Sequence, residues 1–338
     1  MPPKKETKKR AREETPESAS DHEDEKATTS KAKATKTAPK KKAKVSPPPN
    51  NQPTNLVLPV DIKFPSKIAN TTRIATWNIC GLVPSQKKGF QYYVEAEDAD
   101  ILILTETRAN DSPNIPVLDK RYPHKFWSNS SKKSYSGTAI LSKTEPISVD
   151  YTLPGHPEPD TVKGRIVTLE FENLYVVGTY VVNAGTGLKT LDAKKLWNTH
   201  FETYLHSLDA KKPVIWGGDL NVAPTELDLT HAKSNWNKTP GYTEAETSAF
   251  ARILDPPEDA AENAKPFVDV WRKLHGDTKN FTYFSYRFQC RSKGIGWRLD
   301  SFVLSERISE RVKMCEIRDE IYGASDHCPV TLEIEGDL

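Results

Sequence analysis

Residues 213–221, PVIWGGDLN, form an apolar run that ends in polar side chains. Val214 to Trp216 are typical of a buried strand, whereas Asp219 and Asn221 stand where that strand would leave the core. Because side chains alternate along a strand, these two project from the same face, and the preceding Gly217-Gly218 would allow another backbone or a ligand to come close. The segment predicts a sheet whose strand ends carry the functional groups.

The same pattern recurs from Thr71 onward as short β-branched apolar runs. They predict strands over 73–79, 99–107, 138–142, 165–171, 174–182, 213–221, 298–305 and 328–335. Helical spacing appears instead in 191–208 and in 243–254, where Thr243 and Glu246 stand in capping-box register, and a weaker helix is expected over 87–97. This order predicts an α/β domain in which helices cover two packed sheets.

Composition excludes several classes of protein. The longest aliphatic stretches of the 338-residue chain, 101–104 and 175–182, are far shorter than the roughly 18 apolar residues of a spanning helix, so we expect no membrane segment. Four scattered cysteines, without CxxC spacing, predict neither a zinc module nor a disulfide framework. A reducing compartment is therefore favoured.

Residues 1–65 differ in composition from the rest of the chain. Residues 1–50 contain 14 basic and 8 acidic side chains, whereas the other 288 residues contain 34 and 38. With almost no aliphatic residue, this stretch is predicted to be a disordered basic tail, followed by one domain over 66–338. Its clusters KKETKKRAR (4–12) and PKKKAKV (39–45) are typical of nuclear import signals, the alternative being a solubilising tail.

Polar side chains stand repeatedly at the predicted strand ends. They are Asn78, Glu106, Asp219, Asn221, Asp300, Asp326 and His327. One such residue alone indicates a loop cap or an Asx turn, but so many together indicate a hard cation and a general base. Oxygen donors without paired cysteines favour Mg²⁺, with Mn²⁺ as the alternative, over zinc. Cleavage of a phosphate ester is the chemistry that such a site suits.

Seven motifs, in order, resemble those of the exonuclease III family of apurinic/apyrimidinic (AP) endonucleases. They are WNICGL (77–82), LTETR (104–108), YSG (135–137), YVVNAG (180–185), GGDLN (217–221), GWRLD (296–300) and SDHCP (325–329). The wider superfamily includes DNase I-like nucleases and inositol polyphosphate phosphatases. The resemblance extends from about Arg73 to the end of the chain. It implies a DNase I-like four-layer α/β sandwich of two packed mixed β-sheets flanked by helices.

The resemblance also implies a function. The chain is expected to be a nuclear, monomeric, Mg²⁺-dependent enzyme of base excision repair that incises double-stranded DNA 5′ to an abasic site. A 3′-phosphodiesterase or a 3′-to-5′ exonuclease activity is expected to accompany it. Import receptors are expected to bind the tail.

Individual roles follow from the same resemblance. Glu106 and Asp326 would hold the Mg²⁺ with Asn78 close by, and Asp219 would orient or deprotonate the attacking water. Asn221 would support that water. The other catalytic candidates are Tyr180 and Asn183 as donors to the phosphate, and His327, held by Asp300, as the group that binds a non-bridging oxygen. Asp219, Asn221 and His327 also belong to the candidate metal set, and the proton acceptor stays open among Asp219, Tyr180 and His327.

Two further groups concern DNA binding. Tyr283, Trp297 and Leu299 map to the family's apolar pocket for a flipped-out sugar without a base, the alternative being ordinary core residues. Candidates for contacting the DNA backbone are Lys87, Lys88, Tyr135, Arg291, Lys293 and Arg298. Each of these could equally be a solvated surface charge or, for Tyr135, the edge of the core.

Cys80 departs from the family's pattern, which has Asp or Asn at this position. A neutral thiol is a poor Mg²⁺ ligand, so the sequence predicts weaker metal affinity with retained activity. Two alternative functions stay open. One is a superfamily phosphodiesterase or phosphatase that acts on unmodified DNA, RNA or an inositol phosphate, and the other is a DNA-binding scaffold with a weakened site.

Overall fold

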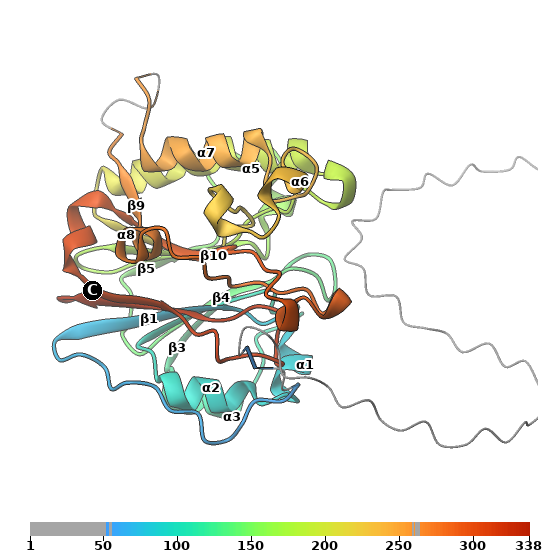
Figure 1. Ribbon diagram of the computed structural model, residues 1–338. Coiled ribbons are helices and arrows are strands. Elements are labelled where there is room, and N and C mark those ends of the chain that lie inside the picture. Colours follow the sequence, from blue (N-terminus) through green and yellow to red (C-terminus); the bar gives the residue numbers. More distant parts are fainter. Residues whose placement is uncertain (1–51, 54–55, 259, 261–263) are drawn as a thin grey trace, which may run out of the picture. The chain divides into compact units, whose positions relative to one another are not determined.

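The computed structural model describes residues 52–53, 56–258, 260 and 264–338 (Figure 1). The predicted import clusters and most of the predicted tail lie outside these ranges. Within them, no helix is both long enough and apolar enough to cross a bilayer.

Two six-stranded sheets form the centre of the domain. In spatial order, the first contains β11 (Val312–Ile317), β12 (Val330–Glu335), β1 (Thr71–Asn78), β2 (Ile101–Thr105), β4 (Thr138–Ser142) and β3 (His124–Ser128). The second contains β5 (Ser148–Asp150), β6 (Ile166–Glu170), β7 (Tyr175–Tyr180), β8 (Val214–Asp219), β10 (Asp300–Ser305) and β9 (Phe267–Asp269). Each sheet has one parallel pair at its centre, β1 with β2 and β7 with β8, and the other pairs are antiparallel.

The two sheets pack face to face through aliphatic side chains such as Ile103 and Ile140, which are fully buried. Glycines in β8 allow neighbouring side chains and backbone to come close to this strand. A Cβ on Gly217 would lie 2.5 Å from the Phe302 ring, and one on Gly218 would lie 2.0 Å from the Thr179 carbonyl oxygen. The Gly217-Gly218 pair therefore serves packing within and between the sheets, where the sequence left open an approach by a ligand.

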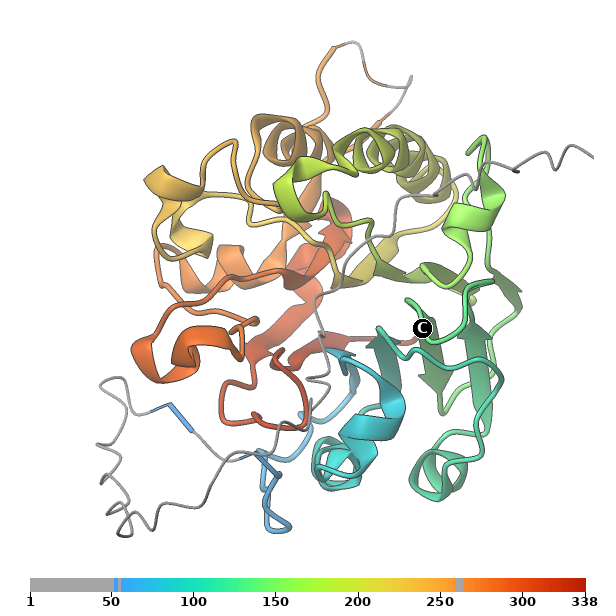
Figure 2. The same ribbon diagram turned by 90° about the vertical axis from the view of Figure 1, so that its right-hand side faces the viewer.

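Helices cover both outer faces and give the predicted four layers (Figures 1 and 2). The helices are α1 (Leu82–Gln86), α2 (Phe90–Glu97), α3 (Pro116–Arg121), α4 (Pro159–Val162), α5 (Leu191–Asp209), α6 (Ala232–Asn235), α7 (Glu244–Leu254) and α8 (Val270–His275). Trp197 and Phe201 of α5 and Phe250 of α7 pack on the second sheet, whereas Phe90 and Tyr93 of α2 pack on the first. The fold class predicted from the sequence is confirmed.

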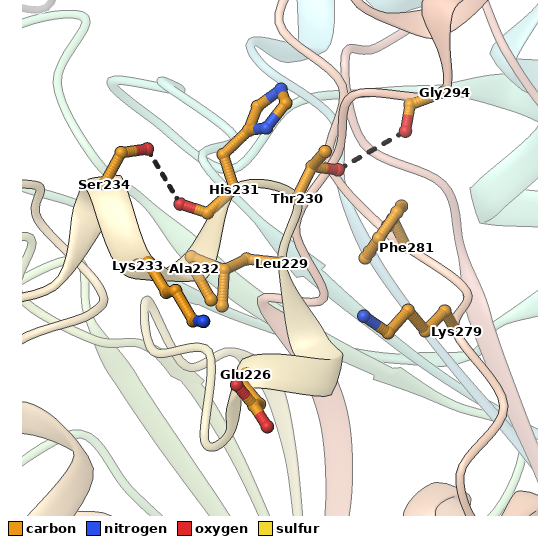
Figure 3. Close-up of a pocket in the computed structure, with 10 residues that line it drawn as sticks. All are labelled: Glu226, Leu229, Thr230, His231, Ala232, Lys233, Ser234, Lys279, Phe281 and Gly294. Atoms are coloured by element: carbon orange, nitrogen blue, oxygen red, sulfur yellow. Dashed lines mark hydrogen bonds between the residues drawn. The ribbon is translucent and has the colours of Figure 1, made fainter.

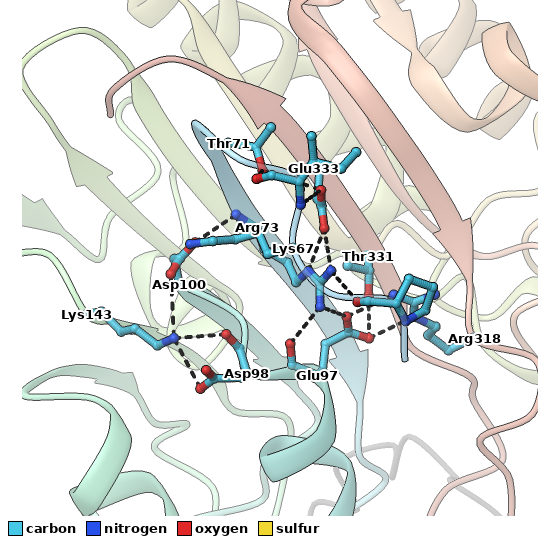
Figure 4. Close-up of polar contacts among 12 residues, drawn as sticks. Lys67, Thr71, Arg73, Glu97, Asp98, Asp100, Lys143, Arg318, Thr331 and Glu333 are labelled. Carbon is cyan, nitrogen blue, oxygen red and sulfur yellow. Dashed lines mark hydrogen bonds and ion pairs between the residues drawn. The ribbon is translucent and has the colours of Figure 1, made fainter. Parts of the chain in front are cut away.

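Buried ion pairs fasten α2 to the first sheet (Figure 4). Glu97, at the end of α2, accepts hydrogen bonds from Arg318 Nε at 2.8 Å and from Thr331 Oγ1 at 3.0 Å. Arg73 Nε donates to Glu333 at 2.7 Å. Because these charges are buried and paired, losing one partner would leave the other uncompensated.

The folded domain begins before residue 66. Leu58 is buried, and its backbone N–H donates to the Lys88 carbonyl at 2.8 Å. Ile62 and Phe64 pack partly against the same core cluster. The last residues of the stretch predicted as tail therefore belong to the domain, because their few apolar side chains pack on the same core as α2.

Candidate active site

Polar side chains from both sheets meet at one rim of the sandwich. Asn78 ends β1 and Asp219 ends β8, and Glu106 follows β2 directly. The Asn78 Nδ2 donates to Glu106 Oε1 at 3.1 Å and to Asp219 Oδ2 at 2.9 Å. One fully buried amide thus joins acids that belong to different sheets.

Glu106 is held by a cation that follows it in the sequence. Arg108 Nη2 donates to Glu106 Oε2 at 2.8 Å and lies 3.7 Å from Cys80 Sγ. Burial alone would raise the pKa of Glu106, but the Arg108 charge and the Asn78 hydrogen bond outweigh it and lower the pKa. Glu106 is therefore ionised at neutral pH.

His327 and Asp300 form a buried pair next to Asp219. Asp300 opens β10 directly opposite Asp219 in the antiparallel register, and its Oδ2 lies 2.7 Å from His327 Nδ1. Burial opposes charge on the imidazole, but Asp300, with a smaller contribution from Asp219, raises the pKa of His327 to about 10. Burial and the negative charge of Asp300 raise the pKa of Asp219 to about 7. Near neutral pH the site thus combines a proton donor with an acid that can exchange its proton.

The loop that carries His327 is fastened to β1. The Ser325 hydroxyl donates to the Asn78 carbonyl at 2.6 Å, and Trp77 Nε1 donates to the His327 carbonyl at 2.9 Å. These bonds hold the end of the last loop against the strand end that carries Asn78.

Two asparagines form the next part of the rim. Asn183 Nδ2 donates to Asn221 Oδ1 at 2.8 Å, and Asn221 Nδ2 donates to the Val181 carbonyl at 2.8 Å. The Asn221 backbone N–H donates to Asp219 Oδ1 at 3.0 Å, with Asn221 in the left-handed region at a φ of 49°. Asn183 itself is exposed, and its amide oxygen accepts the Gly185 N–H at 2.7 Å.

Tyr180 ends β7 beside this group. Burial, followed by the Glu106 charge, raises the pKa of Tyr180 well above its ordinary value. The Arg165 guanidinium lies 5.1 Å from the centre of the Tyr180 ring. The hydroxyl therefore stays protonated and is a hydrogen-bond donor.

Asp326 and Cys80 lie close enough to Glu106 for its charge to act on both. Burial raises the pKa of Asp326, and so does the Glu106 charge. Burial, then the charges of Asp326 and Glu106, raises the pKa of the Cys80 thiol, which hydrogen-bonds to Asp326. This mutual repulsion of carboxylates is what a bound divalent ion would relieve, so the residues fit such an ion.

The predicted metal set also contains Asp219, His327 and Asn78, which make other contacts than Glu106 and Asp326. One ligand atom each of Asp219, Asp300 and His327 lie within 4.8 Å of one another. His327 is also paired with Asp300, whose charge raises the pKa of the imidazole to about 10. Asn78 uses its amide nitrogen for Glu106 and Asp219 and its oxygen for the Cys80 N–H. Asp219, Asp300 and His327 thus form one cluster, which Asn78 joins to Glu106.

The three residues of the predicted sugar pocket lie beside this cluster. The Tyr283 ring lies 4.9 Å from the His327 ring, centre to centre, and the Tyr283 N–H donates to the Trp297 carbonyl at 2.8 Å. A Cβ on Gly241 would lie 3.6 Å from Leu299 and 3.7 Å from Trp297. Both side chains therefore stand against the Gly241 backbone.

Two of the predicted DNA contacts are wrong, because their side chains are buried. Arg298 pairs with Asp228 and Asp269 at 2.7 Å each, and Arg291 packs over the Phe284 ring while it donates to Cys328 Sγ at 2.8 Å. Both arginines are 2 % exposed, so neither reaches a phosphate. They stabilise the loops around the site instead.

The remaining predicted DNA contacts are at the surface. Lys293 is exposed. Tyr135 is partly exposed, and its hydroxyl accepts a hydrogen bond from Arg165 at 2.9 Å. Arg165 and Arg108 were missed by the sequence analysis. The signal available for Arg108 was its place two residues after Glu106 in LTETR.

A separate groove of about 520 Å³ lies between segments 226–234 and 279–294 (Figure 3). It is lined by Glu226, Leu229, Thr230, His231, Ala232, Lys233, Ser234, Lys279, Phe281 and Gly294. The Thr230 hydroxyl donates to the Gly294 carbonyl at 3.3 Å across it. None of the catalytic candidates lines this groove.

Known proteins resemble this chain in sequence. The DNA repair nuclease APEX1 of Danio rerio is 41% identical over 268 residues, which cover 78% of this chain and 82% of that protein. An exodeoxyribonuclease of Bacillus subtilis is 40% identical over 264 residues, 78% of this chain and 99% of that protein.

Solved structures resemble it in fold. The AP endonuclease from Archaeoglobus fulgidus superposes with a TM-score of 0.68 at 25% identity, over 78% of this chain and 100% of that one. The AP endonuclease from Leishmania major superposes with a TM-score of 0.66 at 26% identity, over 80% of this chain and 89% of that one. The sequence model of the endonuclease/exonuclease/phosphatase family matches residues 75–327 of this chain. Together with the polar rim, these likenesses show that the chain belongs to the endonuclease/exonuclease/phosphatase family.

Proposed function

We propose that this chain is a divalent-metal-dependent DNA repair nuclease that hydrolyses the phosphodiester 5′ to an abasic site. The observation that carries the proposal is the rim where Asn78 joins Glu106 to Asp219, next to the Asp300–His327 pair. The names of the relatives point the same way, since the Danio rerio protein is called a DNA repair nuclease and a Dictyostelium discoideum relative, 38% identical, an AP-site endonuclease. The Bacillus subtilis relative is named an exodeoxyribonuclease, which supports an exonuclease activity at the same site.

The side chains divide the reaction among themselves. Asp219, with its pKa of about 7, orients the attacking water and accepts its proton. His327 is charged and donates to a non-bridging oxygen, where negative charge develops. Asn221 and Asn183 hold the water and the phosphate through their amides, and Tyr180 donates from its hydroxyl.

Glu106 and Asp326 would hold the metal, which we propose to be Mg²⁺, with Mn²⁺ as a substitute. A bound divalent ion would polarise the phosphoryl oxygen and stabilise the charge of the leaving group. The Cys80 thiol beside these ligands offers no hard oxygen, so we expect the ion to be held more weakly than by a site with a third carboxylate.

Substrate selection is proposed to rest on Tyr283, Trp297 and Leu299. A sugar without a base is small enough for a tight apolar pocket that excludes an intact nucleotide. Lys293 and Tyr135 are proposed contacts to the DNA backbone. We further propose that the chain acts as a monomer in the nucleus, on double-stranded DNA, and that import receptors bind its N-terminal basic clusters.

A nicking assay tests the function. A duplex with one tetrahydrofuran abasic analogue is compared with the same duplex without it, in Mg²⁺, in EDTA and after Mg²⁺ is restored. We expect single-strand nicking 5′ to the analogue that stops in EDTA and returns with Mg²⁺. Equal cleavage of both duplexes would favour a nuclease of unmodified DNA. If Asp219→Asn binds abasic DNA like the wild type and the wild type never cuts, the scaffold alternative is correct.

A further inference from the structure

A buried ion pair lies behind the proposed catalytic residues and has no role in the mechanism above. Lys194, in the first turns of α5, and Glu246, in the first turn of α7, are both buried, with Lys194 Nζ 3.3 Å from Glu246 Oε1. Replacing a buried pair by apolar side chains is often neutral or stabilising for a fold. The role of this pair is therefore sought in the other groups to which Lys194 and Glu246 are hydrogen-bonded.

On the α5 side, the pair reaches the proposed catalytic loop. Lys194 Nζ also donates to the backbone carbonyl of Asn221. Asn221 is the residue with a φ of 49°, in the left-handed region that asparagine adopts more readily than most other residues with a side chain. One turn earlier, the Thr190 hydroxyl donates to the Asn183 carbonyl at 2.7 Å. The start of α5 thus holds both asparagines whose amides meet at the rim.

On the α7 side, the pair reaches the wall of the proposed sugar pocket. The Glu246 carboxylate accepts the Gly241 N–H at 2.9 and 3.0 Å and the Thr243 hydroxyl at 2.8 Å. Gly241 is the residue against which Trp297 and Leu299 stand. A chain of contacts therefore runs from the pocket wall through Glu246 and Lys194 to Asn221.

We propose that Lys194 is a positioning residue for the reaction: paired with Glu246, it holds the Asn221 carbonyl and so keeps Asn221 in place, with its backbone N–H on Asp219 and its side-chain amide on Asn183. The inference rests on the proposed endonuclease function. Burial lowers the pKa of Lys194 while Glu246 opposes the shift. A loss of position near 1 Å can lower a rate by about 100-fold without a change in substrate affinity.

The test compares Lys194→Met, Lys194→Arg and a control, Arg73→Met. Arg73 is buried and paired like Lys194, but it lies near the start of β1, at the opposite end of that strand from Asn78 (Figure 4). Single-turnover cleavage of the abasic duplex, its Kd in EDTA and the thermal midpoint are measured for each. We expect Lys194→Met to lower the rate by about 100-fold with an unchanged Kd. Lys194→Arg should recover most of the rate, whereas Arg73→Met should lose thermal stability and keep the rate.

Other outcomes separate the two proposals. If the wild type nicks and Lys194→Met nicks equally fast, or if Arg73→Met loses as much rate, Lys194 has no positioning role and the endonuclease function stands. If the wild type does not nick at all, the function fails and this inference fails with it. Should Lys194→Met not fold, Glu246→Gln gives the answer, because it removes the charge that holds Lys194 and keeps the size of the side chain. A wild-type rate in Glu246→Gln would overturn the proposal.

Discussion

Replacing Asp300 with Asn should shift the pH dependence of cleavage to lower pH. The substitution removes the negative charge 2.7 Å from His327 Nδ1 and keeps the shape of the side chain. His327 must be protonated and Asp219 ionised in the proposed mechanism, so the wild type should be active between pH values of about 7 and about 10. Without the Asp300 charge, both pKa values fall, because that charge raises each of them.

The magnitude follows from the fraction of protonated imidazole. If the pKa of His327 falls from about 10 to its ordinary 6.5, about 3 % of the imidazole is protonated at pH 8, so the rate there should fall about 30-fold. This loss of rate should become smaller toward pH 6, because more of the imidazole is then protonated. Single-turnover rates at saturating Mg²⁺, measured from pH 5.5 to 10, provide the profile.

The matched control is Glu97→Gln, which also removes a buried, paired carboxylate charge but lies at the end of α2 among Arg73, Arg318 and Thr331 (Figure 4). It should lower the thermal midpoint and leave the pH profile in place. The reasoning would be refuted if Asp300→Asn lowered the rate by the same factor at every pH. Asp300 would then orient His327 without setting its charge.

Four further predictions concern the metal, the pH dependence of stability, a buried ion pair and the DNA surface. Cys80→Asp should lower the Mg²⁺ concentration for half-maximal cleavage, because it adds a hard oxygen ligand; an unchanged metal titration would contradict this. Burial lowers the pKa of His206 from its ordinary 6.5, so the unfolded chain gains a proton first as the pH falls and the wild type should lose stability below about pH 6.5. Urea unfolding of His206→Gln should show a smaller loss over that range, and an equal loss would exclude His206 as the cause. Arg298→Ala should cost about 3–5 kcal/mol of unfolding free energy, since it removes the guanidinium from the buried Asp269, whereas Asp228 keeps Arg272. Lys293→Ala should instead reduce the salt dependence of DNA binding by about one unit of slope, with stability unchanged within about 0.5 kcal/mol.

The central strands and the long helices could be predicted from the sequence because burial there is periodic or continuous. β4 was predicted with its observed bounds, and the capping box of α7 is present, with Glu246 Oε2 accepting the Thr243 N–H at 3.2 Å. The strands β3, β5, β9 and β11 were missed. β5 is three residues long and mostly exposed, and β3 is largely half-buried on both faces, so neither has a clear alternation to detect. Edge strands are set by pairing with a neighbour, which local sequence does not record.

The candidate site could be predicted as a set of residues but not as a set of contacts. Strand ends placed Asn78, Glu106 and Asp219 correctly at one rim, since a polar side chain after a buried strand has few other positions. The roles of the arginines could not be read in this way. Arg298 in GWRLD resembles a surface charge until Asp228, 70 residues earlier, is seen to pair with it. Long-range pairing of this kind depends on the tertiary fold.

The balance of buried charge distinguishes the structural ion pairs from the proposed catalytic centre. At Arg298, one guanidinium faces Asp228 and Asp269, and the further cation Arg272 also contacts Asp228, so acids and bases are equal in number. At the rim, the four carboxylates Glu106, Asp219, Asp300 and Asp326 face the cations Arg108 and His327. Fully ionised, this group has an excess of two negative charges, which matches one divalent cation. The same excess would repel a phosphate, so a bound ion would lower the electrostatic cost of bringing the phosphate to the site and would also assist the chemical step.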